Sequence, residues 1–172
     1  MISPFLTHPI GPPRRLVTFD PQRELLYKLE REIIGKSIYH VVSRKNLQTV
    51  ADHVCRYYKL PTLKIKVVNQ PSNREFGWYI SHTRDDSAPF GFGIWLNRGF
   101  HGANVSTMIH ELSHYITDTV YENNEDHGKE FMGIYMHLMA NYRIIPSDCF
   151  RLMARRHSIE IDTCFTPADI RG

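Results

Sequence analysis

Apolar residues recur at helical spacing near both ends of the chain, and in its middle they alternate with polar residues. A repeat of three to four residues predicts helices, and a repeat of two predicts strands. The predicted helices cover residues 21–34, 43–58, 104–119, 127–142 and 148–156. The predicted strands cover residues 63–68, 76–82 and 90–97, with a last short strand at 158–162. This order of elements predicts an α+β fold with a small, mostly antiparallel sheet of about three or four strands packed on helices.

Local signals support three helix starts. Asp20, Ser43 and Asn104 each precede a predicted helix and have side chains that cap helix N-termini. With 172 residues, the chain is long enough for one domain with a sizeable core. We expect an extended, proline-rich arm at residues 1–18, the domain at 19–162, and a tail at 163–172.

Composition narrows the classes of partner. The hydrophobic fraction is 42% and the charged fraction 23%, as in ordinary soluble proteins. A net charge of +3, spread along the chain, argues against a nucleic-acid partner. No apolar stretch is long enough for a membrane span, and the N-terminus lacks the pattern of a secretory signal. Three well-separated cysteines indicate reduced thiols. We therefore expect a soluble, cytoplasmic protein, in the host cytoplasm if it is viral.

The chemistry lies in one segment, His110-Glu111-Leu112-Ser113-His114. Histidines four residues apart differ by only about 40° around a helix, so both can bind one metal ion. Glu111 lies about 100° from His110, beside this stripe and not in line with it. It can therefore serve as a general base for a metal-bound water. The apolar residues of the same helix lie on the opposite face.

A catalytic zinc ion takes three protein ligands and leaves one position open for water. For the third ligand we favour His127, which follows a loop and precedes the next helix. A helix N-terminus keeps an imidazole neutral and able to bind metal. Because two histidines and one glutamate form an equally common site, Glu122, Glu125 and Glu130 remain alternatives. The predicted cofactor is one Zn²⁺ ion.

The stretch from Ile94 to Met139 resembles the SprT-like and related minimal zinc metallopeptidases, of the zincin type. It is more similar still to small bacterial and phage metallohydrolases that combine a His-Glu-x-x-His helix with a downstream His-Gly-x-x-Phe motif, here residues 127–131. The likeness extends over most of residues 19–162. It implies a zincin-like fold, ligation by His110, His114 and His127, and Glu111 as the base. The chain lacks the cysteine-rich C-terminal ribbon that SprT proteins often have, which argues against a DNA-linked role.

In such peptidases a strand before the active-site helix forms the upper edge of the cleft. Ile94, Trp95, Leu96 and Asn97 are in that place, and an exposed edge there would bind an extended peptide by main-chain hydrogen bonds. Alternatively, Ile94 and Leu96 are ordinary core residues and Trp95 is a surface aromatic. Both interpretations can hold, since alternate residues of a strand face opposite ways.

Further residues have weaker signals. Tyr135 is either a hydrogen-bond donor to the oxyanion or a core residue beside Phe131. Asp118 either orients a metal ligand or lies at a solvated helix end. His82 and His101 are possible further groups near the metal, although isolated loop histidines usually have no such role. His137 and His157 are expected on the surface.

The motif predicts a zinc-dependent hydrolase, with peptide bonds as the expected substrate. One alternative is a zinc-containing binding or regulatory protein that keeps the site without hydrolysis. Glu111 argues against it, because a purely structural site does not need a base. The other alternative is hydrolysis of a non-peptide amide, which uses the same zinc chemistry.

Overall fold

The computed structural model describes residues 20–34, 41–69, 76–80, 93–98, 102–121 and 125–163. Within these ranges the chain forms five helices and three strands, which confirms the predicted α+β class. The elements are α1 (Arg23–Ile34), α2 (Arg44–Tyr57), β1 (Ile65–Val68), β2 (Gly77–Ile80), β3 (Gly93–Asn97), α3 (Val105–Val120), α4 (Lys129–Asn141) and α5 (Ser147–Arg156). The predicted arm at 1–18 and residues 164–172 of the predicted tail lie outside the described residues.

The three strands form one mixed sheet in the order β1-β3-β2. β1 pairs with β3 in parallel, and β2 pairs with β3 antiparallel. The prediction of a mostly antiparallel sheet is therefore wrong, because one of the two pairings is parallel. Side chains alternate with the same period in both kinds of strand, so the sequence pattern does not distinguish them.

β3 is the central strand, and all five of its residues are buried. Trp95 is not a surface aromatic: its ring stacks on Trp78 of β2, with centroids 6.2 Å apart, and the Nζ of Lys66 lies 4.2 Å from its centroid. The expectation of an exposed edge at residues 94–97 is also wrong. A strand paired on both sides has no free main-chain groups for a further strand.

Side chains from α2 cover the start of the outer edge of β1. Gln48 accepts a hydrogen bond from the amide of Ile65 at 2.9 Å and donates one to the carbonyl of Leu63 at 2.7 Å. Arg44 donates to the carbonyl of Ile65 at 3.0 Å. These bonds satisfy main-chain groups that an edge strand otherwise offers to another chain. Among the described strands, β2 is the other edge.

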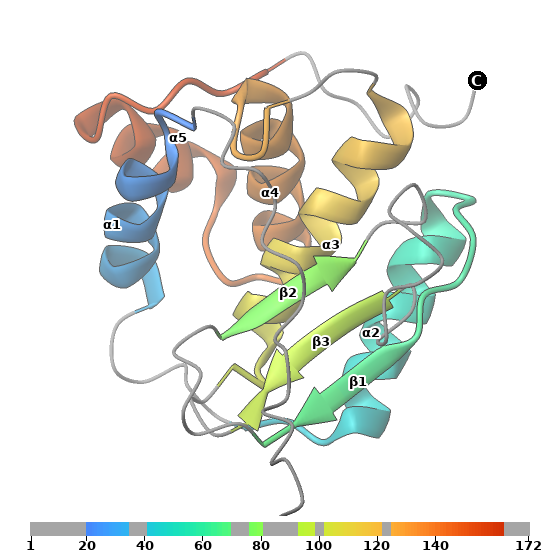
Figure 1. Ribbon diagram of the computed structural model, residues 1–172. Coiled ribbons are helices and arrows are strands. Elements are labelled where there is room, and N and C mark those ends of the chain that lie inside the picture. Colours follow the sequence, from blue (N-terminus) through green and yellow to red (C-terminus); the bar gives the residue numbers. More distant parts are fainter. Residues whose placement is uncertain are drawn as a thin grey trace, which may run out of the picture.

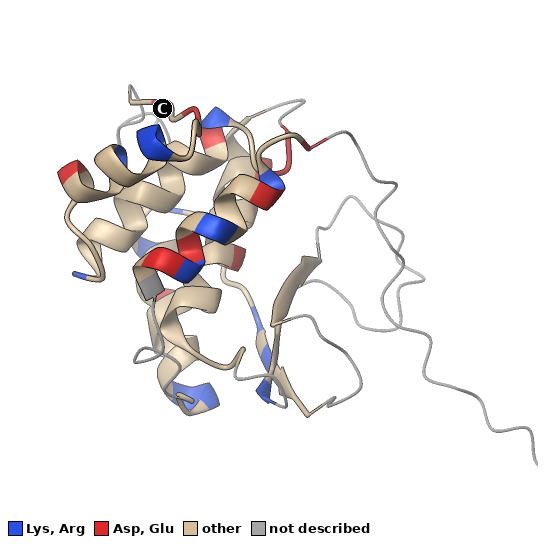
Figure 2. Ribbon diagram, turned by 90° about the vertical axis from the view of Figure 1, so that its left-hand side faces the viewer, with Lys and Arg blue, Asp and Glu red and all other residues tan. Residues whose placement is uncertain are grey.

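The helices lie on one side of the sheet. Figure 1 shows α2 and α3 behind the strands, and the side view of Figure 2 shows the sheet nearly edge-on with the helices on one side of it. α3 packs against both the sheet and α4, so it runs through the middle of the molecule. The core between these elements includes Leu47, Ile94, Leu112 and Phe131, all without exposed surface. The helix with the His-Glu-x-x-His motif is therefore held on several sides.

The predicted helix starts are largely correct. Asp20, Ser43 and Asn104 each accept a hydrogen bond from the amide N–H three residues further along. α4 begins at Lys129 rather than at His127, and α5 at Ser147, one residue earlier than predicted. No helix within the described ranges is both long and apolar enough to cross a bilayer.

The predicted last strand at 158–162 is wrong, since this segment is irregular. It is fixed instead by single contacts with α4, where the amide of Asp162 donates to the carbonyl of Lys129 at 2.9 Å. The segment passes so near α4 that a Cβ atom on Gly133 would lie 2.4 Å from the carbonyl oxygen of Asp162. Packing against a helix thus replaces the pairing that the alternating pattern suggested.

Candidate metal centre

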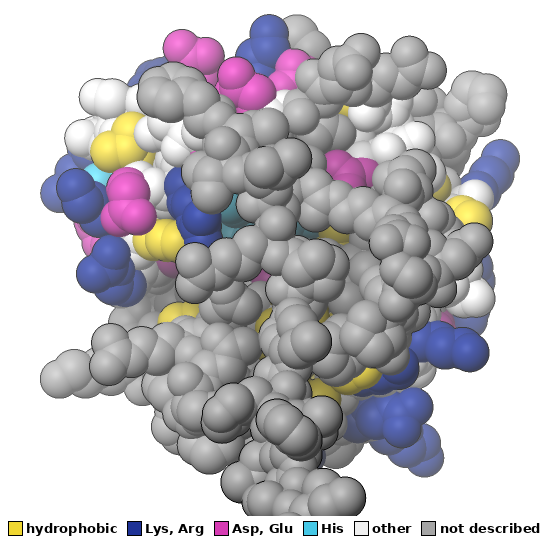
Figure 3. Space-filling view, viewed as in Figure 1, with side chains coloured by type: hydrophobic (Ala, Val, Ile, Leu, Met, Phe, Trp, Pro, Cys, Tyr) yellow, Lys and Arg dark blue, Asp and Glu magenta, His cyan; other side chains and the backbone are white. Residues whose placement is uncertain are grey.

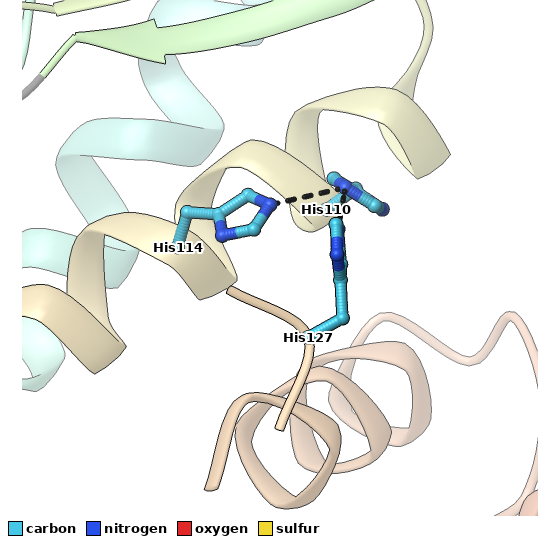
Figure 4. Close-up of side chains that lie close together, drawn as sticks. All are labelled: His110, His114 and His127. Atoms are coloured by element: carbon cyan, nitrogen blue, oxygen red, sulfur yellow. Dashed lines mark hydrogen bonds between the residues drawn. The ribbon is translucent and has the colours of Figure 1, made fainter. Parts of the chain in front are cut away.

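α3 presents its two motif histidines on the face opposite its apolar residues. Met108, Ile109 and Leu112 have no exposed surface and pack into the core. His110 and His114 project from the other face with their rings converging (Figure 4). The predicted division of this helix into a core face and a histidine face is confirmed.

His127 lies in the segment that leads into α4 and completes a cluster of three imidazoles (Figure 4). Its Nε2 is 3.4 Å from the Nε2 of His110, which is 3.3 Å from the Nε2 of His114. The candidate ligand atoms of the three rings all lie within 4.8 Å of one another, close enough to hold one metal ion. Of the alternatives for the third ligand, Glu125 and Glu130 are described but are not part of this cluster, and Glu122 lies outside the described residues.

The spacing of the nitrogens fits a small tetrahedral ion. Zinc–nitrogen bonds of about 2.0–2.1 Å at tetrahedral angles place the ligand nitrogens about 3.3 Å apart. The two Nε2 separations from His110 agree with this value, and the ligand atoms of His114 and His127 lie within 4.8 Å of each other. Three protein ligands leave the fourth corner of such a tetrahedron for water or substrate.

Two carboxylates from the N-terminal part of the chain hold the outer nitrogens of two of these rings. The Nδ1 of His110 lies 2.7 Å from Oε1 of Glu30, and the Nδ1 of His127 contacts Oδ2 of Asp20. Asp20 has two roles, because its other oxygen accepts from the amide of Arg23 at the start of α1. Partners of this kind orient metal-binding imidazoles and raise their basicity.

Sequence reasoning missed both carboxylates. The sequence predicts only a capping role for Asp20 and no role for Glu30. They are separated from their histidines by 107 and 80 residues. One signal for Glu30 was available: Arg23, Tyr27 and Glu30 share one face of the predicted first helix, within about 60°. A polar face that includes a tyrosine and an acid is typical of solvated helices too, so this signal is weak.

The carboxylates also determine which nitrogen faces the cluster. In a neutral imidazole only one nitrogen carries hydrogen. A hydrogen on Nδ1, directed at Glu30 or Asp20, leaves the Nε2 of His110 and of His127 as bare lone pairs 3.4 Å apart. Lone pairs that converge in this way could bind one metal ion.

Burial and charge act differently on the two buried rings. Burial lowers the pKa of His110, but the charge and hydrogen bond of Glu30 outweigh it, and the pKa is raised overall. Burial also lowers the pKa of His127, and here Asp20 only partly opposes it, so the pKa is lowered. Burial raises the pKa of Asp20, but the hydrogen bonds and charges of His127 and Arg23 together outweigh it, and this pKa is lowered overall. A proton is therefore held more readily at His110 than at His127.

Glu111 is buried on the flank of the cluster, with 6% of its surface exposed. Its charge contributes to raising the pKa of both His110 and Tyr27. Figure 3 shows histidine surface near the centre of this face of the molecule. Glu111 is not part of the group of three histidines, and its role as a general base stays a prediction.

Phe131 explains the second motif, His127-Gly128-x-x-Phe131. Its ring contacts all three histidines, with centroid distances of 5.3 Å to His110, 4.5 Å to His114 and 5.0 Å to His127. It has no exposed surface. The phenylalanine thus forms an apolar base against which the imidazoles pack, and it fixes their spacing without binding metal.

Tyr135 is fully buried, stacks on Phe131 and contacts His110. This is the core placement that sequence reasoning considered, and it gives no support to a role at the oxyanion. Burial first, and then the nearby Glu30 carboxylate, raise the pKa of Tyr135 well above its usual value. Asp118 is exposed, and its role in orienting a ligand stays a prediction.

The remaining histidines lie away from the cluster or outside the described residues. His137 lies 2.8 Å from Asn141 one helical turn along α4, and His157 lies 2.7 Å from Glu32 of α1. His82 and His101 lie outside the described residues. None of the described histidines adds a fourth ligand.

Comparison with known proteins identifies no family. No protein-family model matches the chain, and no curated protein or solved structure is significantly similar to it. The functional argument therefore depends on the geometry of the site.

Proposed function

We propose that this chain is a zinc-dependent hydrolase of the minimal zincin type that cleaves peptide bonds. The observation that carries the proposal is the convergence of His110, His114 and His127, with nitrogen separations that suit a tetrahedral ion. A bound zinc ion would lower the pKa of water toward neutrality and polarise the carbonyl that is attacked. Three nitrogen ligands with one open position are typical of catalytic rather than structural zinc sites.

In the proposed reaction, Glu111 is the general base. It takes a proton from the attacking water as the new carbon–oxygen bond forms, and it delivers a proton to the amine as the carbon–nitrogen bond breaks. Its burial beside the cluster keeps the carboxylate out of bulk water, which strengthens its interaction with nearby charge. Glu30 and Asp20 act on the rings alone, holding the Nδ1 atoms so that the Nε2 atoms face inward.

An extended peptide would pair with β2 rather than with β3. β2 is an edge among the described strands and packs against α3, whereas side chains of α2 already bond to the main chain at the start of β1. The main chain of Gly77–Ile80 would provide the hydrogen bonds, and residues on alternate sides would provide side-chain preference. The proposed substrate is therefore a protein or peptide with an extended segment.

The test is Glu111→Gln compared with His114→Ala, with dye-labelled casein as the substrate. E111Q should retain one zinc ion per chain and lose casein hydrolysis by about 10²–10⁴-fold, the usual contribution of a general base. H114A should lose both zinc and hydrolysis, because it removes a ligand. Full activity of zinc-loaded E111Q would refute the proposed mechanism.

The same assays on the wild type and E111Q distinguish the two alternatives. Zinc binding by the wild type, without hydrolysis of casein or other peptides, would favour the zinc-containing binding protein. Hydrolysis of small amides but not of peptides, abolished by E111Q, would instead favour a non-peptide amidohydrolase. In both cases the metal site would be correct and the proposed substrate wrong.

A further inference from the structure

Helix α1 presents a polar face to the metal centre and an apolar face to the core. Leu26 and Leu29 have no exposed surface and anchor the helix. Arg23, Tyr27 and Glu30 lie on the other face, within about 60° of one another. Glu30 holds His110, so the same face brings Tyr27 to the metal ligands.

The ring of Tyr27 packs on two of the three histidines. Its centroid is 6.4 Å from that of His110, with the rings stacked, and 6.1 Å from that of His127 in an edge arrangement. Phe131 and Tyr135, the other aromatic rings of the site, have no exposed surface, whereas Tyr27 is only partly buried. Of these three aromatic side chains, all within the described ranges, only that of Tyr27 has exposed surface.

The hydroxyl of Tyr27 is arranged to donate a hydrogen bond. The Nε of Arg23 donates to its oxygen at 3.3 Å, and the guanidinium carbon lies 5.6 Å from the ring centroid. The hydroxyl hydrogen has no acceptor within the part of the chain that the structure describes. A hydroxyl that accepts a bond from a cation is polarised and becomes a stronger donor. Burial, together with the charges of Glu30 and Glu111, raises the pKa of Tyr27 although Arg23 opposes the shift, so the hydroxyl keeps its proton.

We propose that Tyr27 is a catalytic residue that donates a hydrogen bond to the substrate carbonyl oxygen as that oxygen gains negative charge. This inference rests on the proposed hydrolysis. As water attacks, its oxygen bonds to the carbonyl carbon and the π electron pair moves to the carbonyl oxygen. Tyr27 stabilises that charge and keeps its proton throughout, while Glu111 carries the transferred proton. Tyr27, on a different helix, thus replaces Tyr135 as the donor.

The test is Tyr27→Phe, which removes the hydroxyl but keeps the ring against His110 and His127. With dye-labelled casein, kcat should fall by about 10²–10³-fold, as on loss of one oxyanion donor, with little change in KM. Zinc content should not change. Tyr142→Phe is the matched control, because its hydroxyl points to the carbonyl of Val50 at 3.5 Å, away from the cluster. An equal kcat for Y27F and the wild type would overturn the assignment. So would a fall in kcat for Tyr135→Phe that Y27F does not show.

A second measurement does not depend on turnover. Acetohydroxamate presents oxygen anions to a metal ion, and its binding can be followed in the visible spectrum of the cobalt-substituted protein. Y27F should bind it about ten- to a hundredfold more weakly, because a hydrogen bond to a charged oxygen is lost, while its affinity for cobalt is unchanged.

The two proposals can therefore fail separately. A wild type that binds zinc but cleaves no casein contradicts the proposed hydrolysis, whatever Tyr27 does. Equal hydroxamate affinities of Y27F and wild type would show that the hydroxyl does not reach the metal-bound anion, and would refute the role of Tyr27 even in an active hydrolase.

Discussion

Replacing Glu30 by glutamine removes the negative charge behind His110 while keeping the shape of the side chain. Glu30 and His110 are 2.7 Å apart, and only 17% and 11% of their side-chain surfaces are exposed, so water screens their interaction little. A carboxylate partner of a metal-binding histidine contributes about 10–100-fold to metal affinity. This range corresponds to about 1.4–2.7 kcal/mol, in agreement with the usual value of a hydrogen bond to a charged group.

The assay is zinc competition with a chromophoric chelator, and the control is Glu32→Gln. Glu32 lies on the same helix but bonds to His157 and Arg156 instead of a metal ligand. E30Q should lose about 10–100-fold in zinc affinity and E32Q should match the wild type. Unchanged affinity in E30Q, or an equal loss in E32Q, would refute the view that the carboxylate acts through His110.

Three further predictions concern stability. Asn104→Ala should lower the free energy of unfolding by about 1 kcal/mol in urea titration, because it removes the cap of α3; no loss would show that the cap is not stabilising. Gly133→Ala should cost about 1–3 kcal/mol, since its Cβ would press on the carbonyl of Asp162; an unchanged midpoint would contradict this packing. The hydrogen bond to His157 lowers the pKa of Glu32 in the folded protein. The stability that Glu32 contributes is therefore complete above its unfolded pKa of 4.5, and it is lost as the pH falls through the lower folded pKa. The Tm difference between wild type and E32Q should therefore disappear on acidification below pH 4.5, and a constant difference would count against it.

The helix with the motif was predictable because its geometry is local. Residues four apart on a helix must lie on one face, so the sequence alone indicated that His110 and His114 would act together. The cap at Asn104 is equally local, being a contact across three residues. The position of His127 next to these two histidines is not local, since it depends on how the loop before α4 returns the chain to α3.

The contacts that complete the site were not predictable in this way. Asp20 and Glu30 meet their histidines only after α1 has packed on the rest of the domain, and no local pattern specifies that packing. The order of the strands in the sheet could not be predicted for the same reason. The run at Ile94–Asn97 indicated a strand, but its central position depends on two partners, one of which, β1, is about thirty residues earlier in the chain. Local periodicity thus predicts elements and faces, whereas tertiary packing decides neighbours.

The central claim is that three imidazoles bind one zinc ion and leave one position open. Metal analysis combined with X-ray absorption at the zinc edge of the purified protein tests it directly. The expected result is one zinc per chain, with three histidine nitrogens at about 2.0–2.1 Å and one oxygen from water. A chain that binds no stoichiometric metal, or a zinc ion with four protein ligands, would contradict the claim.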